Sequence, residues 1–203
     1  NPNMPIEGFL DISKIKKIAE FCEKKNIILF IDEVYFHFND FSSIKLIRKY
    51  NNLFVARSFS KAFGLAGIRL GYLISSKKNI SYVSKFRSGY ECNTLSAEIC
   101  QLFINNFNFV KNYIKDIKIG SKYLKKELNK LSIDHTGGNY GNFVYINLKS
   151  FSKNNKIINY LKKKNIYVRS GWPSPLDKGF SLSISSKKIM KIFIREFKKA
   201  VKL

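Results

Sequence analysis

The stretch SFSKAFGLAGIRLGY, residues 58–72, gathers side chains that can do covalent chemistry. Lys61 lies among small and apolar residues; Ser58 and Ser60 precede it, and Arg69 follows it. Apolar surroundings and a nearby arginine favour the neutral amine of a lysine, which is the form that attacks an aldehyde to make a Schiff base. The two hydroxyls and the arginine predict a phosphate cradle, because a guanidinium group binds phosphate through paired hydrogen bonds. A lysine for an aldehyde beside a phosphate cradle predicts a site for pyridoxal phosphate.

A second set of polar residues follows the apolar run IILFI. Asp32 lies at the carboxyl end of this predicted strand, where open α/β sheets bind ligands. A carboxylate there can pair with a protonated pyridine nitrogen and keep the ring an electron sink. Tyr35 can direct its hydroxyl at the phenolic oxygen of the same ring. Taken alone, an aspartate after a strand is more often a turn former, and a tyrosine is as often core packing. The prediction therefore depends on both sets of residues occurring in one α/β unit.

Apolar periodicity predicts the elements that hold these residues. The opening NPNMPIEG is a turn, and Asp11 caps a helix that ends near residues 25–26. A short helix is predicted at 44–50, and strands at 27–35, 53–58 and 71–74. The continuous apolar run at 27–31 needs cover on both faces, so this order predicts an α/β domain with a mostly parallel sheet.

The second half of the chain predicts a smaller α+β domain. From Leu95 to Leu128 the pattern is helical, with interruptions at 105–108 and Gly120, and a loop follows at 135–142. The remaining predicted elements are strands at 143–148, 166–170 and 179–185, a helix capped by Ser152 and a terminal helix at 187–202. We expect a large domain over 1–120, including an interdomain helix, and a small domain over 121–203.

Composition narrows the classes of partner. The formal net charge of +23 comes mostly from lysines on predicted helix faces, which indicates solvated helices and a field that favours anionic substrates. No recognition-helix, zinc-finger or RNA-binding aromatic motif accompanies the charge, so we expect no nucleic-acid partner. No apolar run is long enough for a membrane span.

Cysteine and histidine spacing gives no sign of a disulfide framework or a metal site. Cys22, Cys92 and Cys100 form no CxxC pair, and His37 and His135 lie far apart in the chain. These features predict a reducing, cytoplasmic location and no metal. Because the first residue is Asn and the chain opens on a turn motif, we also expect it to be the C-terminal part of a longer protein.

Three motifs in succession, NPNMPIEG, IDEVY and SFSKAFGLAGIRLGY, resemble the signatures of fold-type I pyridoxal-phosphate aminotransferases of class I/II, in the histidinol-phosphate aminotransferase-like branch. The resemblance is specific over residues 1–75 and looser to the C-terminus. It implies that Lys61 is the Schiff-base lysine and the base of the 1,3-proton shift. It also implies that Asp32 pairs with the pyridine nitrogen and that Tyr35 bonds the phenolic oxygen. Phosphate binding falls to Ser58, Ser60 and Arg69. The family's usual homodimer, with active sites at the subunit interface, is expected here as well.

The chain departs from this family at two places. The family's opening turn usually reads NPNNPTG, and its fourth residue, an asparagine, touches the phenolic oxygen; here that residue is Met4, and Thr-Gly is replaced by Ile6-Glu7-Gly8. Near the C-terminus, Ser181 stands where the family usually has an arginine that binds the substrate α-carboxylate. Arg169, in YVRSG, matches a family arginine that binds substrate anions. One substrate is therefore expected to carry a phosphate or another anion elsewhere, unless Arg169 takes over the carboxylate.

These features leave three functional hypotheses. The first is an aminotransferase acting between an amino-acid donor and a keto or aldehyde acceptor. The second is a pyridoxal-phosphate decarboxylase or lyase on the same scaffold, favoured by the loss of the carboxylate-binding arginine at Ser181. The third is a catalytically silent relative or a binding module, which the presence of Lys61, Asp32 and Arg69 argues against.

Overall fold

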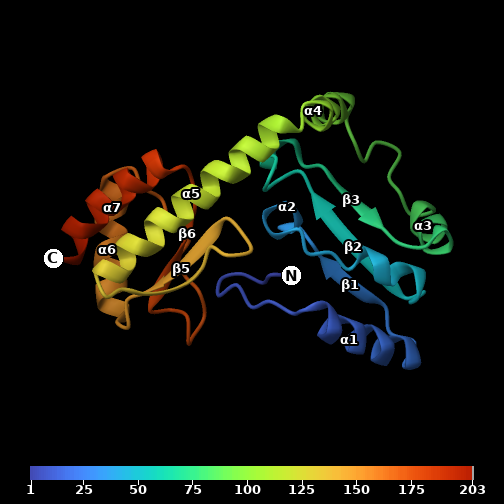
Figure 1. Ribbon diagram of the computed structural model, residues 1–203, viewed down its shortest axis with the longest axis horizontal. Helices are drawn as coiled ribbons and strands as arrows, with labels where there is room; N and C mark the ends of the chain where they lie inside the picture. Colours follow the sequence, from blue (N-terminus) through green and yellow to red (C-terminus); the bar gives the residue numbers. More distant parts are fainter. Residues whose placement is uncertain (203) are drawn as a thin grey trace. The chain divides into compact units, whose positions relative to one another are not determined.

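The computed structural model describes residues 1–202, and the chain divides into two compact units (Figure 1). The first unit holds residues 1–2 and 8–113, and the second holds residues 3–7 and those from Ile114 onward. The division falls inside helix α5 (Asn108–Lys130). The boundary expected at 120/121 lies further along the same helix.

The first unit is built on a sheet of the strands β1 (Leu29–Asp32), β2 (Leu53–Ser58) and β3 (Gly71–Ile74) in that order. The predicted second and third strands are confirmed at these bounds, whereas the first is shorter than the apolar run. β1 and β2 run parallel, with Asp32 opposite Ala56. β3 runs antiparallel to β2, because the chain between them turns back and the Phe59 N–H donates to the Leu70 carbonyl at 3.2 Å. The carboxyl ends of β1 and β2 therefore lie at one edge.

Helix α1 (Ile12–Lys24) begins where Asp11 caps it, as predicted: the aspartate Oδ1 accepts the Lys14 N–H at 2.9 Å. Its apolar face packs into a core with the first two strands, made of Ile15, Ala19, Ile31, Tyr50, Leu53 and Val55. Burying each of the larger side chains contributes about 1.5–3 kcal/mol. The other helices of this unit are α2 (Phe36–Asn39), η1 (Ile44–Arg48), η2 (Ala66–Ile68), α3 (Lys77–Ser84) and α4 (Thr94–Asn105).

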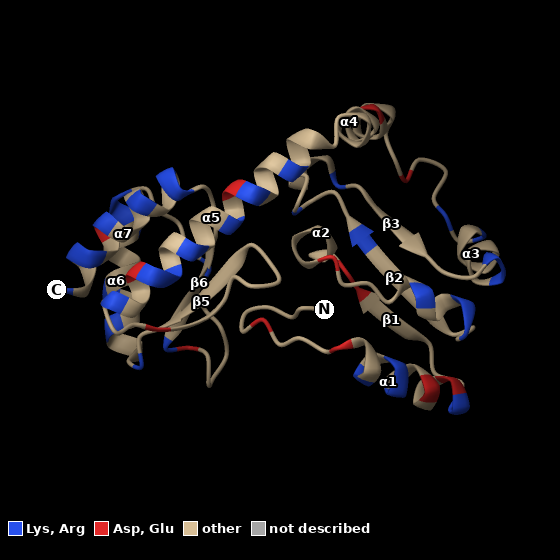
Figure 2. Ribbon diagram, viewed as in Figure 1, with Lys and Arg blue, Asp and Glu red and all other residues tan. Residues whose placement is uncertain are grey.

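The second unit is an antiparallel sheet of β4 (Asp134–Gly137), β5 (Phe143–Asn147) and β6 (Gly179–Ser183), accompanied by α5, α6 (Phe151–Lys163) and α7 (Lys187–Val201). Phe180 on β6 meets Phe197 on α7 edge to face, with ring centroids 6.2 Å apart. The α+β composition predicted for this part of the chain is therefore present. Basic residues recur along its helices, as the blue segments of Figure 2 show, and most of these lysines are exposed.

Four local predictions were wrong in this half of the chain. Residues 134–137 form β4, which overlaps the start of the loop predicted at 135–142, since they pair with β5. Ser150, not Ser152, caps α6 through a bond from the Lys153 N–H. Of 166–170, only Arg169 pairs, in a single bridge to Ser181. Gly120 does not interrupt α5 but lies inside it, where a Cβ would stand 1.8 Å from the Ser185 carbonyl oxygen.

Among the helices of residues 1–202, none combines the length and the apolar character that crossing a membrane requires.

Candidate active site

The carboxyl ends of β1 and β2 place Asp32 and Ser58 on neighbouring strands. Asp32 ends β1 opposite Ala56, which lies two residues before Ser58 on β2. The Asp32 carboxylate is exposed, and its Oδ1 accepts the Val34 N–H at 2.9 Å, which fixes the side chain at the start of the following turn. The structure therefore places the Asp32 carboxylate at the sheet edge where ligands of α/β folds bind.

A tight turn after β2 brings the two predicted serines together. The Ser58 hydroxyl donates to the Ser60 hydroxyl at 2.9 Å and accepts the Ser60 N–H at 3.0 Å. The loop is closed further along, where Ser58 Oγ also lies 3.4 Å from the Leu70 carbonyl oxygen. Two hydroxyls and a main-chain N–H thus share one half-buried turn, the donor set that an anion such as phosphate needs.

Lys61 follows this turn and lies against Tyr35. Its Nζ is 5.7 Å from the centre of the Tyr35 ring, and the side chain is half-buried. Tyr35 is only 4% exposed, at the start of α2. The next two residues, Ala62 and Phe63, are buried, so the loop after Lys61 is anchored in the core. The structure brings the predicted lysine and the predicted tyrosine together.

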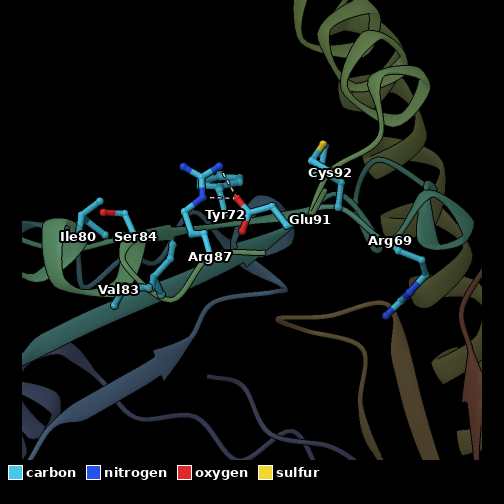
Figure 3. Close-up of a pocket in the computed structure, with 11 residues that line it drawn as sticks. Arg69, Tyr72, Ile80, Val83, Ser84, Arg87, Glu91 and Cys92 are labelled. Carbon is cyan, nitrogen blue, oxygen red and sulfur yellow. Dashed lines mark hydrogen bonds and ion pairs between the residues drawn. The ribbon is translucent and has the colours of Figure 1, made fainter. Parts of the chain in front are cut away.

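Arg69 lies on the same loop, but its guanidinium contacts the loop itself. Its Nη1 donates to the Ala66 carbonyl at 3.0 Å, the side chain is exposed, and the backbone has φ +55°. Arg69 is one of the residues that line a cavity of about 500 Å³. Figure 3 shows its side chain pointing away from Arg87 and Glu91, which form an ion pair. Its neighbour Leu70 is bonded to Ser58 and Phe59. The backbone of Leu70 therefore lies at the Ser58–Ser60 turn. The Arg69 guanidinium instead contacts the Ala66 carbonyl.

A buried ion pair behind these residues was not predicted. Arg57 donates from Nε and Nη2 to one oxygen of Glu33 at 3.1 and 3.0 Å, and its guanidinium lies 3.4 Å from the centre of the Phe36 ring. Ser42 bridges the pair, accepting from Arg57 at 2.8 Å and donating to Glu33 at 3.1 Å. The side chains are 9% and 0% exposed. The sequence signal that could have indicated this ion pair is an acidic residue, Glu33, directly after one apolar strand and an arginine, Arg57, just before the end of the next.

His37 lies beside this pair and has an aromatic environment. Its ring meets Phe36 and Phe63 edge to face, with centroids 4.9 and 5.1 Å away. Burial, and then the positive charge of Arg57, lower the pKa of His37 below its ordinary value. The imidazole is therefore neutral at neutral pH and packs as an aromatic side chain.

In the second unit, Arg169 and Ser181 are direct neighbours. The Arg169 N–H donates to the Ser181 carbonyl at 2.9 Å, and the Ser181 N–H donates back at 2.8 Å. The Arg169 guanidinium is exposed and lies 4.4 Å from the centre of the Trp172 ring. Ser181 is 3% exposed, and its hydroxyl has no hydrogen-bond partner within residues 1–202. The backbone of the remaining arginine, Arg169, is thus paired in a single bridge with Ser181, the residue that stands where the family arginine was expected.

Comparison with known proteins identifies the class. The chain belongs to the family of class I and II aminotransferases, whose model matches residues 1–190. The resemblance drawn from the three opening motifs is therefore confirmed.

Among particular relatives, the chain is 35% identical over 170 residues to a histidinol-phosphate aminotransferase of Thermotoga neapolitana, covering 84% of this chain and 49% of the relative. It is 30% identical over 208 residues to a dihydroxyacetone phosphate transaminase of Campylobacter jejuni, covering 98% of this chain and 54% of the relative. The chain therefore spans about half the length of these relatives.

Solved structures show the same fold. The histidinol-phosphate aminotransferase of Sinorhizobium meliloti, in complex with pyridoxal-5'-phosphate, superposes with a TM-score of 0.87 at 19% identity. The match covers 100% of this chain and 56% of that one. The fold-type I architecture expected from the sequence is thus confirmed for the part of that fold that the chain represents.

Proposed function

We propose that the complete protein is an aminotransferase that uses pyridoxal phosphate to move an amino group from an amino acid to a keto or aldehyde acceptor. The observation that carries this proposal is the placement of Lys61 against Tyr35, directly after the Ser58–Ser60 turn. Asp32 lies at the neighbouring strand end. These residues come from one unit of a chain in this family.

The donor set fits the cofactor group by group. Asp32 would hold the proton of the pyridine nitrogen, and Tyr35 would donate its hydroxyl to the phenolic oxygen. The Ser58 and Ser60 hydroxyls would bind the phosphate, and Arg69 would exchange its bond to the Ala66 carbonyl for phosphate oxygens. When bound, the cofactor supplies an electron sink for the carbanion formed at the substrate. Lys61 would hold the aldehyde carbon of the cofactor covalently until the substrate amine replaces it, and its freed amine would then carry the proton between the substrate α-carbon and that aldehyde carbon.

We propose that the acceptor is an anionic, phosphorylated carbonyl compound. Two features support this. Ser181 supplies no charge for an α-carboxylate, whereas Arg169 beside it has an exposed guanidinium. The net charge of +23 favours anions, and both relatives described above are named for phosphorylated substrates. Arg169 would bind the anion in bidentate fashion.

We also propose that the protein works as a homodimer. The segment between α3 and α4 exposes large aromatic side chains: Phe86 is 89% exposed and Tyr90 98% exposed. Aromatic residues of this kind are enriched at protein interfaces. Sedimentation of the complete protein should give a dimer, and Tyr90→Glu should shift it toward monomer; a wild-type monomer at micromolar concentration contradicts the proposal.

Absorbance of the complete protein tests the proposed function. Added pyridoxal phosphate should give the visible band of lysine-bound cofactor, and Lys61→Ala should abolish it, whereas Lys45→Ala, at an exposed lysine of the same unit, should leave it. Glutamate should then convert the spectrum to that of the amino form of the cofactor. Carbon dioxide release without this conversion would favour the decarboxylase instead. A protein that stays colourless with added cofactor contradicts both.

A further inference from the structure

The Asn3–Glu7 turn is part of the second unit, although residues on both sides of it belong to the first. A buried carboxylate makes this attachment. Glu7 is 7% exposed, and its Oε1 accepts the N–H groups of Tyr140 and Gly141, each at 2.8 Å. The Asn139 N–H donates to both oxygens, at 3.1 and 2.9 Å. The main-chain N–H groups of three successive residues, 139–141, thus donate to the Glu7 carboxylate, which lies more than 130 residues earlier in the sequence.

The loop that supplies these donors is itself fixed to helix α5. The Ser121 hydroxyl donates to the Gly138 carbonyl at 2.7 Å, and Lys125 Nζ donates to Asn139 Oδ1 at 2.6 Å. Gly138 has φ +73°, and a Cβ there would lie 2.7 Å from the Ser121 oxygen. The three N–H groups therefore form a prepared anion cradle, the type of main-chain concavity that binds anions elsewhere. Here a carboxylate of the chain itself occupies the cradle.

The backbone of Glu7 shows that this attachment overrides a local preference. Glu7 has φ +57°, in the left-handed region that favours glycine, and its N–H closes the turn onto the Asn3 carbonyl at 3.0 Å. The chain therefore accepts a strained backbone at the residue whose side chain reaches the cradle. A second bond, from the Thr136 hydroxyl to the Ile6 carbonyl at 2.7 Å, ties the turn to β4.

We infer that Glu7 is a positioning residue: its carboxylate in the 139–141 cradle holds the Asn3–Glu7 turn, and with it Met4, on the second unit. Met4 stands at the position that the resemblance places next to the cofactor. The effect on the reaction rests on the proposed function; the attachment itself does not. Glu7 therefore fastens the turn that carries Met4 to the unit that carries Arg169.

Amide hydrogen exchange of the complete protein tests the attachment without cofactor. Glu7→Gly suits the left-handed backbone and removes the whole side chain with its carboxylate, while Glu7→Gln keeps the side-chain length and removes the charge. Both should speed exchange at residues 139–141 by about tenfold or more, because charge-assisted bonds are lost. Exchange as slow in Glu7→Gly as in the wild type would overturn the inference, since the turn would then need only its backbone shape.

The matched control is Glu127→Gln. Glu127 lies in the second unit and, at 8% exposed, is about as buried as Glu7. Its carboxylate accepts hydrogen bonds from Lys130 and Lys198 instead of main-chain N–H groups. This variant should leave exchange at 139–141 unchanged. A similar acceleration there would mean that Glu7 acts only through general stability, which would also overturn the inference.

Kinetics of the loaded enzyme separate positioning from folding. Glu7→Gly should keep the visible band of lysine-bound cofactor, because Lys61 and the serine turn lie in the first unit. It should raise the KM of a phosphorylated acceptor several-fold with a smaller change in kcat. Accelerated exchange with an unchanged KM would refute the positioning role. Failure of the proposed function is seen separately, as a wild-type protein with no band.

Discussion

At the scale of single residues, the buried Glu33–Arg57 pair ties together the two strand ends that carry the predicted cofactor-binding side chains. Successive side chains of a strand point to opposite faces. Asp32 precedes Glu33 and Ser58 follows Arg57, so the ion pair joins the two strands on the side away from the predicted cofactor residues. Arg57 also stacks on Phe36, which adds a contact that a lysine cannot reproduce.

Replacing one member of this pair should destabilise the protein strongly. Arg57→Met leaves the Glu33 carboxylate buried without its cation, and we expect the free energy of unfolding to fall by about 3–5 kcal/mol. The double variant Arg57→Met, Glu33→Met should lose less, because the uncompensated charge is gone. Urea unfolding measures both, and cofactor titration should show affinity about tenfold weaker in the single variant. A single variant as stable as wild type would show that the pair has no such role.

At the scale of elements, the start of α6 shows how two similar signals compete. The sequence pattern predicted Ser152 as the cap, but Ser150 also precedes the apolar helical pattern. Ser150 has extended backbone (φ −143°, ψ 126°) and its Oγ accepts the Lys153 N–H, whereas Ser152 already lies inside the helix. The cap was decided by where β5 ends, at Asn147, and by the turn that follows it.

Two substitutions two residues apart should therefore differ. Ser150→Ala should lower the free energy of unfolding by about 1 kcal/mol, since it leaves an N-terminal N–H without its cap. Ser152→Ala is the internal control, at an exposed helical position, and should change stability by less than about 0.5 kcal/mol. Thermal or urea unfolding of the two variants side by side measures the difference. Equal losses would mean that the capping bond contributes nothing.

The elements that could be predicted were those whose signals are local. The Asp11 cap, β2 and β3 follow from neighbouring residues, and so do the motifs around Lys61. β4 could not be predicted, because residues 134–137 carry no strand pattern and become a strand only by pairing with β5. The Glu7 cradle and the Glu33–Arg57 pair join residues more than 20 positions apart. The spacing of apolar residues along the sequence carries no information about contacts between such distant residues.

At the scale of the whole molecule, pH should affect stability through Tyr50. This residue is 2% exposed, and its hydroxyl donates to Glu20 Oε1 at 2.8 Å, joining η1 and β2 to α1. Burial, and then the bond to Glu20, raise the pKa of Tyr50 to about 12. In the unfolded chain a tyrosine ionises near pH 10. The raised pKa thus stabilises the fold fully below about pH 10, and this contribution is lost as pH rises toward 12.

Urea unfolding at a series of pH values checks this expectation. The free energy of unfolding of the wild type should fall between pH 10 and 12, and Tyr50→Phe should show a flatter dependence over that interval. Tyr167→Phe, at a side chain 73% exposed, is the control and should leave the wild-type slope in place. If Tyr50→Phe keeps the full slope, then another group is responsible for the alkaline loss.

The assignment of residues 3–7 to the second unit has a practical consequence for anyone who dissects this protein. The small unit is discontinuous along the chain, so a fragment that starts at Ile114 is cut away from the carboxylate that satisfies the amides of 139–141. A soluble excised version needs that turn returned, either as a short grafted segment joined to the fragment or as an added peptide. Truncation designs should therefore follow contacts rather than residue order.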